Sequence, residues 1–224
     1  MSQVRRGRRD ATFRALRNLS PYLLVACLPP SVALSDDSKT SNVHSRWDGL
    51  YIGAGHTDFR FESASADDPA RFYIASTPAH QAFEACHIPF AEARALHLGD
   101  ATKANVRTIR QYVHPDICRS AQLLMGLTTL EPGSNWNTMP CHTHDRRMEV
   151  YFYFDLPESE RVFHFMGEID ETRHLVVAPN QGVIAPSWSI HSGVGTASYS
   201  FIWSMAGENQ VFEDMDGVPT MALR

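Results

Sequence analysis

One stretch, Pro140-Cys141-His142-Thr143-His144-Asp145-Arg146-Arg147-Met148-Glu149, decides the fold because it combines two histidines and a carboxylate with a strand-like alternation. Side chains alternate between the two faces of a β-strand, so His142 and His144 point to the same face. Cys141 and Thr143 then point to the opposite face. This geometry makes Cys141 a poor metal ligand, although it adjoins His142 in the sequence.

His144 and Glu149 are five residues apart, and a continuous strand would therefore put them on opposite faces. A turn or bulge at residues 145–147 must reset the register if both side chains serve one site. Beyond that break, Glu149, Tyr151 and Tyr153 share one face of the next strand. The stretch thus predicts two strands that meet at a charged turn.

His191 is the fourth candidate ligand, and it follows a short apolar run and a proline turn at Pro186. About 40 residues separate it from Glu149, enough for several strands to return the chain to the same interior. Three imidazoles and one carboxylate suit zinc, and also manganese, iron or nickel. We expect one metal ion per chain, preferably Zn²⁺, at His142, His144, Glu149 and His191. Surface or structural roles are expected for the other histidines, His44, His56, His80, His87, His97, His114, His164 and His174.

From residue 47 onward the chain has the pattern of an all-β protein. Short runs rich in Val, Ile, Phe, Tyr and Thr alternate with Gly, Pro, Asn and Asp, which favours a sandwich or a barrel. Helix is expected only near residues 90–96, and turns are expected at residues 131–133, 155–157, 179–182 and 192–195. The predicted strands are residues 50–52, 71–76, 108–113, 122–130, 149–154, 161–166, 174–178, 182–185 and 198–205.

The charge distribution separates the start of the chain from its body. Residues 1–18 contain six arginines and one acid, whereas the remaining chain has 14 basic and 24 acidic residues. An acidic body argues against nucleic acid as a partner, since phosphate binding needs clustered Lys and Arg. No apolar run is long enough to span a bilayer. The four cysteines form no CxxC pair, so we expect reduced thiols in a cytoplasmic protein; a secreted, disulfide-bonded protein is the alternative.

The spacing HxH-x4-E followed by Pro-x4-His is similar to the two motifs of the cupins. The longer stretches 136–144, 146–154, 186–195 and 207–210 resemble the family of 5-keto-4-deoxyuronate isomerases, and the likeness runs from about residue 49 to residue 224. This resemblance implies zinc at the four ligands, a double cupin (a bicupin of two double-stranded β-helix, jelly-roll barrels) and a hexamer.

The resemblance also predicts how the chain is divided. Residues 1–45 do not resemble the start of the family and are expected to be an unrelated, disordered extension; a signal peptide is the alternative. Residues 46–105 are expected to be a remnant of the N-terminal cupin half with a linker. Residues 106–224 are expected to form the C-terminal metal-binding cupin domain. The hypothesis that follows is a truncated or frame-shifted gene product with an incomplete N-terminal half.

The activity implied by the resemblance is a zinc-dependent ketol-isomerase of pectin and uronate catabolism. It interconverts 5-dehydro-4-deoxy-D-glucuronate and 3-deoxy-D-glycero-2,5-hexodiulosonate, so the expected partner is a small keto-uronate. Tyr151 and Tyr153 are candidates for proton transfer or for packing. Arg146 or Arg147 could pair with the substrate carboxylate or lie exposed in the turn; Trp188 and Gln210 could line the pocket. The alternatives are an iron-dependent cupin dioxygenase and an inactive truncated metal-binding cupin.

Overall fold

The computed structural model describes residues 22–28, 47–55 and 71–224. These residues form three antiparallel sheets, with strand orders β3-β1-β2-β4, β11-β10-β13-β8-β15 and β12-β9-β14-β7-β6-β5. The strands are β1 (Tyr22–Leu28), β2 (Asp48–Ile52), β3 (Tyr73–Pro78), β4 (Cys86–Ile88), β5 (Arg94–Leu98), β6 (Arg107–Val113), β7 (Leu123–Leu130), β8 (Trp136–Thr143), β9 (Arg147–Phe154), β10 (Val162–Glu168), β11 (Glu171–Val177), β12 (Gln181–Ala185), β13 (Ile190–Gly195), β14 (Ser200–Gly207) and β15 (Asp216–Gly217), with 3-10 turns at Ala101–Lys103 and Thr220–Ala222.

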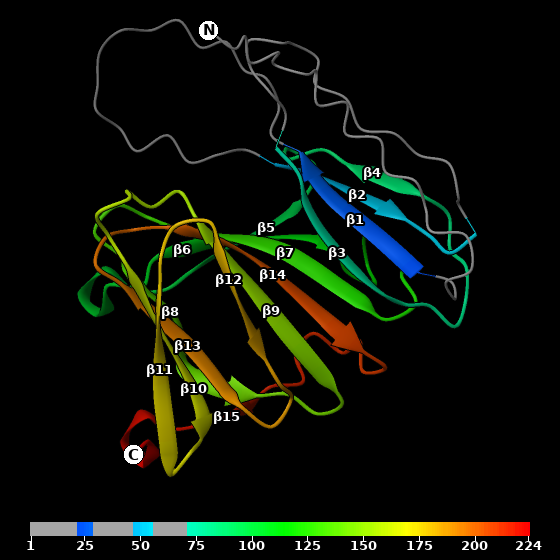
Figure 1. Cartoon of the computed structure of the whole chain (residues 1–224). Helices are drawn as coiled ribbons and strands as arrows, with labels where there is room; N and C mark the ends of the chain where they lie inside the picture. Colours follow the sequence, from blue (N-terminus) through cyan, green and yellow to red (C-terminus); the bar gives the residue numbers. More distant parts are fainter. Residues whose placement is uncertain (1–21, 29–46, 56–70) are drawn as a thin grey trace, which may run out of the picture.

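The five-stranded and six-stranded sheets face each other and enclose an aromatic core (Figure 1). Tyr151 and Trp203 of the six-stranded sheet pack in one buried cluster with Val162 and Val177 of the five-stranded sheet. Strand β9 contributes to this core because its burial alternates and its inward residues include Tyr151 and Tyr153. The arrangement is the double-stranded β-helix of the cupins, and it confirms the predicted all-β fold class.

The four-stranded sheet packs against the outer face of the six-stranded one. Trp47 lies edge-on against Phe154 at 5.3 Å between ring centroids, and Tyr73 lies 5.2 Å from Phe152. The Tyr112 hydroxyl also donates to the Trp47 carbonyl. The same strand, β9, therefore supplies the inner core with its tyrosines and this outer contact with its phenylalanines.

Strand β1 lies within residues 1–45, the range expected to be a disordered extension. It pairs with β2 and β3, with Leu24 opposite both Ile52 and Ser76. At residues 22–28 the structure thus differs from the expectation, because two neighbouring strands offer hydrogen-bonding edges. Residues 1–21 and 29–45 lie outside the described part of the chain, and the three domain boundaries remain predictions.

Two other sequence predictions are wrong. The helix expected near residues 90–96 is absent, and Arg94–Leu98 instead forms the edge strand β5 beside β6. The turn expected at residues 192–195 is part of strand β13, which pairs with β10 and β8. In both places pairing with a neighbouring strand overrides the local preference of the residues.

Within the described ranges, no helix has the length and apolar character needed to cross a membrane.

Candidate metal centre

Four side chains from three strands and one turn converge at one end of the jelly roll. His142 is the second-last residue of β8 and His191 the second residue of β13, and these two residues are direct partners in the five-stranded sheet. Glu149 comes from β9 in the facing sheet, and His144 from the turn between β8 and β9. Their ligand atoms all lie within 4.8 Å of one another. The predicted break in register is confirmed at residues 144–146, where Arg146 adopts a positive φ of 56°.

The distances inside this cluster fit a single metal ion. His142 Nε2 lies 3.2 Å from His144 Nε2 and 3.1 Å from His191 Nε2. Glu149 Oε2 lies 3.3 Å from His144 Nε2 and 3.1 Å from His191 Nε2. Tetrahedral ligands at zinc-like bond lengths are about 3.3 Å apart, and six-coordinate ones at longer bonds about 3.1 Å. Three imidazoles and one carboxylate at these distances thus fit a divalent cation, but they do not determine which metal it is.

The surroundings of His142 and Glu149 keep these two residues in the protonation state that a metal requires. Burial, helped by the neighbouring His191 and His144, lowers the pKa of His142 to about 3, so its imidazole is neutral at pH 7. Burial acts to raise the pKa of Glu149, but His191 and His144 outweigh it and hold that pKa well below its usual range. A neutral imidazole beside an ionised carboxylate is a donor set ready for a cation.

Cys141 lies outside this cluster, as the alternation along the strand predicts. Its side chain is fully buried and packs with Ile190 and Val218 on the other face of β8. Burial raises the pKa of the thiol, which further disfavours a thiolate ligand.

Tyr151 and Tyr153 follow Glu149 on the inner face of β9, as predicted. The Tyr151 ring lies 5.8 Å from the His191 ring, and its hydroxyl is 3.5 Å from Thr138 Oγ1. The Tyr153 hydroxyl lies 2.8 Å from His164 Nδ1, deeper in the jelly roll. Burial raises the pKa of both phenols well above their usual range, so both keep their protons at neutral pH.

His164 is an inner-face residue that sequence analysis did not single out. It is fully buried, its ring lies 5.2 Å from Tyr151, and its Nε2 has no hydrogen-bond partner among the described residues. Burial lowers its pKa to about 4. The alternation of β10, whose inward positions include Val162 and His164, is the signal that could have indicated an inward orientation.

The two arginines of the turn have different surroundings. Arg146 is 61% exposed and pairs with Asp145 at 3.4 Å and with Glu208 at 3.5 Å. Arg147 is only 2% exposed, so the expectation of an exposed turn residue is wrong for it. Its guanidinium donates to the carbonyls of Val211, Phe212 and Asp214, and it also lies 3.0 Å from His144 Nδ1.

Trp188 and Gln210 were expected to line the site. Trp188 is 55% exposed in the turn before β13, next to Ser187, whose carbonyl accepts a hydrogen bond from the His144 backbone amide. The Gln210 side-chain amide donates to Ser120 Oγ at 2.8 Å and is thereby held away from the cluster. Both residues thus lie in loops that contact His144, but the Gln210 side chain is hydrogen-bonded to Ser120 instead.

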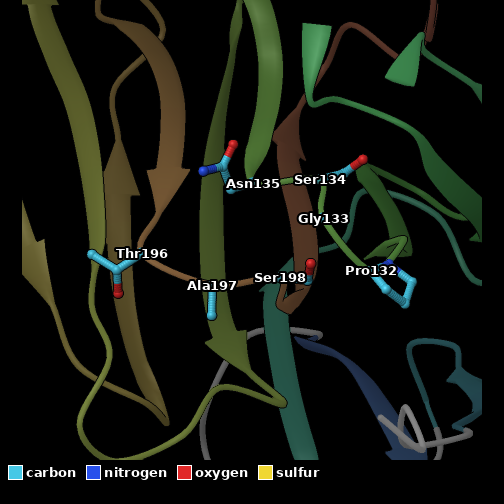
Figure 2. A pocket seen from close by; sticks show the side chains of 7 residues that line it. All are labelled: Pro132, Gly133, Ser134, Asn135, Thr196, Ala197 and Ser198. Carbon is cyan, nitrogen blue, oxygen red and sulfur yellow. The ribbon is translucent and has the colours of Figure 1, made fainter. Parts of the chain in front are cut away.

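A separate pocket of about 300 Å³ is formed by residues 132–135 and 196–198 (Figure 2). These residues precede β8 and β14, whereas His142 lies near the end of β8 and Glu149 pairs with Met205 near the end of β14. The pocket therefore lies at the opposite strand ends from the four candidate ligands and contains none of them.

Comparison with known proteins identifies relatives for most of the chain. The model of the KduI/IolB family matches residues 32–218. A protein of Rhizobium meliloti (strain 1021), named 4-deoxy-L-threo-5-hexosulose-uronate ketol-isomerase 1, is 56% identical over 177 residues, which cover 79% of this chain and 63% of the relative. A protein of Bacillus pumilus (strain SAFR-032) with the name 4-deoxy-L-threo-5-hexosulose-uronate ketol-isomerase is 57% identical over 79% of this chain and 64% of its own.

Among solved structures, an IolB-like protein from Salmonella typhimurium LT2 superimposes with a TM-score of 0.63 at 13% identity. The superposition covers 89% of this chain and 80% of that one. At this identity the similarity concerns the fold alone. The alignments with the two curated relatives span 63% and 64% of those proteins' lengths.

Proposed function

The chain belongs to the KduI/IolB family, and we propose that it is a metal-dependent ketol-isomerase acting on a keto-uronate. The proposed reaction interconverts 5-dehydro-4-deoxy-D-glucuronate and 3-deoxy-D-glycero-2,5-hexodiulosonate in pectin and uronate catabolism. The observation that carries the proposal is the convergence of His142, His144, Glu149 and His191, in a chain whose relatives bear the name of such isomerases.

We propose Zn²⁺ as the metal, one ion per chain. Three imidazoles and one carboxylate with their ligand atoms within 4.8 Å of one another form a donor set that suits zinc. When bound, such an ion acts as a Lewis acid toward the oxygens on the two reacting carbons. His142, His144, Glu149 and His191 would be occupied in holding it.

The chain's own phenols are the candidates for handling protons. In the enediol route, a proton leaves the carbon that bears the hydroxyl and a proton is added to the neighbouring carbonyl carbon. The hydroxyl oxygen loses its proton, and the former carbonyl oxygen gains one. Tyr151 Oη is the better donor toward a developing oxyanion, because its ring lies beside His191 and its raised pKa keeps the proton in place. Tyr153 is engaged by His164, and Arg146 remains a candidate for the substrate carboxylate because its side chain is exposed.

The test combines metal analysis with a coupled isomerase assay on the same sample. We expect one equivalent of zinc and turnover of the keto-uronate. His191→Ala should lose both, and His174→Ala, an exposed histidine of β11, should lose neither. Iron with oxygen uptake would instead support a cupin dioxygenase. Bound metal without turnover of any keto-sugar would support a non-catalytic metal-binding cupin.

We further propose a cytoplasmic homo-oligomer, with the hexamer implied by the family resemblance, and neither nucleic acid nor membrane as a partner. Free thiols at Cys86, Cys118 and Cys141 support a reducing compartment. Exposed apolar side chains on two edge strands, Val176 of β11 at 57% and Ile184 of β12 at 65%, support association. Light scattering on the eluting protein would give the mass; a monomer at micromolar concentration would contradict the assembly.

A further inference from the structure

The loop between β14 and β15, residues 208–215, crosses over the turn that carries His144. We call it the C-terminal strap. Asn209 Nδ2 donates to the Asp145 carbonyl at 2.8 Å and also to the Asp214 carboxylate. At the neighbouring position, Gly207 pairs with Arg147 at the end of β14. The strap is therefore joined to the β8–β9 turn by the Asn209 side chain, directly after the pairing of β14 with β9.

Arg147 is the centre of this connection. Its guanidinium donates to three strap carbonyls, those of Val211, Phe212 and Asp214, the last at 3.0 Å. The residue is 2% exposed, so the cation is withdrawn from water and depends on these carbonyls. A single guanidinium with several donors in a fixed plane can hold three carbonyls at once, which an ammonium group cannot do in the same way.

The Asp214 carbonyl contacts His144, one of the four candidate ligands. His144 Nδ1 lies 3.0 Å from the Asp214 oxygen and also 3.0 Å from Arg147 Nη2. The guanidinium can only donate and the carbonyl can only accept, so the proton on Nδ1 decides which contact is a hydrogen bond. His144 Nε2 faces Glu149 Oε2 at 3.3 Å and is the atom turned toward the cluster.

An imidazole that ligates through Nε2 must carry its proton on Nδ1. In that state the Asp214 carbonyl accepts from His144, and Arg147 donates to the same carbonyl. We infer that Arg147 is a positioning residue: it clamps the C-terminal strap so that the Asp214 carbonyl fixes the tautomer and the orientation of His144. Outer partners of this kind set ligand orientation in metal sites generally.

This inference rests on the proposed metal binding, but one of the two measurements that test it is made without metal. Arg147→Met removes the donors at similar length. Arg173→Met is the matched control, because it loses the same charge from an exposed arginine of β11 that pairs with Glu171. The first readout is the zinc dissociation constant, measured by competition with a chromophoric chelator. The second is amide hydrogen exchange of residues 208–215 in the metal-free protein.

We expect Arg147→Met to weaken zinc binding about 10- to 100-fold and to accelerate exchange in the strap, with Arg173→Met unchanged in both. Arg147→Lys should fall between the wild type and Arg147→Met, since it keeps the charge and some of the donors. In zinc-loaded wild-type protein, ¹⁵N spectra of the ring should report His144 protonated at Nδ1.

A dissociation constant within twofold of wild type in folded Arg147→Met would overturn the inference, as would unchanged strap exchange. If the wild type binds no zinc, the proposed function fails, and strap exchange alone decides on the clamp. If Arg147→Met does not fold, Asn209→Ala replaces it, because Asn209 anchors the same strap without touching His144. The zinc dissociation constant and the hydrogen exchange of residues 208–215 are then measured on Asn209→Ala and judged by the same criteria.

Discussion

Cys141 and His142 adjoin in the sequence, yet their side chains lie on opposite faces of β8. Cys141 packs with Ile190 and Val218, and His142 belongs to the metal cluster. The alternation of a strand was sufficient to predict this difference, because period 2 is fixed by the backbone. The same argument identified Glu149, Tyr151 and Tyr153 as one inward row.

Replacing Cys141 by Ser tests that assignment. We expect zinc stoichiometry and affinity to be retained, because the thiol faces the apolar side of the strand. The free energy of unfolding is expected to fall by about 1–3 kcal/mol, since the new hydroxyl is buried among apolar side chains. Metal analysis and urea unfolding measure the two effects. His142→Ala is the contrast, and loss of metal in Cys141→Ser would refute the alternation argument.

The partners of His144 were not predictable from sequence. Arg147 stands in the quoted motif, but nothing in the motif shows that its guanidinium reaches carbonyls 64 to 67 residues later in the chain. Such contacts depend on where the C-terminal strap returns, which no local pattern encodes. The four candidate ligands could be predicted from the sequence, because HxH-x4-E followed by Pro-x4-His is a rare combination of metal-binding residues.

His164 should make the metal-free protein sensitive to acid. Its folded pKa of about 4 lies below the unfolded value of about 6.5, so between these values the unfolded state binds more protons. Its contribution to stability is complete above pH 6.5 and is lost as pH falls toward 4. At pH 5 the loss is about 2 kcal/mol.

The measurement is the free energy of unfolding in urea at several pH values on metal-free protein. His164→Gln keeps an acceptor for the Tyr153 hydroxyl and removes the titration, so its stability should fall less steeply between pH 6.5 and 4. His174→Gln, on the exposed part of β11, is the control. Equal pH dependence in wild type and His164→Gln would contradict this account.

At the scale of elements, sequence reasoning succeeded for strands with a buried face or a continuously apolar sequence and failed for the exposed edge strand β5. Strands β6, β7, β9 and β14 alternate or are continuously apolar, and they were predicted within two residues of their bounds. Strand β5 has an almost wholly exposed pattern and contains Arg, Ala and Leu, which favour helix. Only pairing with β6 makes it a strand, and that information is not local.

The sequence of residues 192–195, with two glycines, predicts a turn where the structure has the second part of β13, and packing explains Gly193. A Cβ on Gly193 would lie 2.8 Å from Asn137 Nδ2 and 3.0 Å from the Tyr153 hydroxyl. Gly193 is therefore required by the buried polar side chains around it. Glycine in a strand often marks such a close approach.

Gly193→Ala should accordingly destabilise the protein by about 1–3 kcal/mol, the usual cost of overpacking a buried site. Asn137 also donates to Tyr199 Oη at 2.6 Å, so displacing its amide would disturb a second hydrogen bond. Urea unfolding gives the change. Gly217→Ala, where no atom lies within 4 Å of the new Cβ, should change stability little. Equal effects of the two substitutions would argue against a packing role for Gly193.

At the scale of the whole molecule, the four-stranded sheet packs against the outer face of the six-stranded sheet, to which β6, β7, β9 and β14 all contribute. Strand β9 carries Glu149 and the tyrosines inward, and Phe152 and Phe154 outward. The ring of Phe154, 2% exposed, lies against Trp47 from the segment before β2. The division at residue 105 predicted from the family resemblance therefore crosses a well-packed contact.

We expect the two parts to unfold as one cooperative unit, and Phe154→Ala tests this. Truncating a buried aromatic side chain costs about 3–5 kcal/mol. If the parts are coupled, amides of β2 and β9 lose hydrogen-exchange protection together and by the same free energy. Leu175→Ala, at a site 42% exposed, is the control and should leave both strands protected. Selective loss of protection in β2 with β9 unchanged would mean that the first sheet opens independently, and the metal-binding part would then stand as a separate domain.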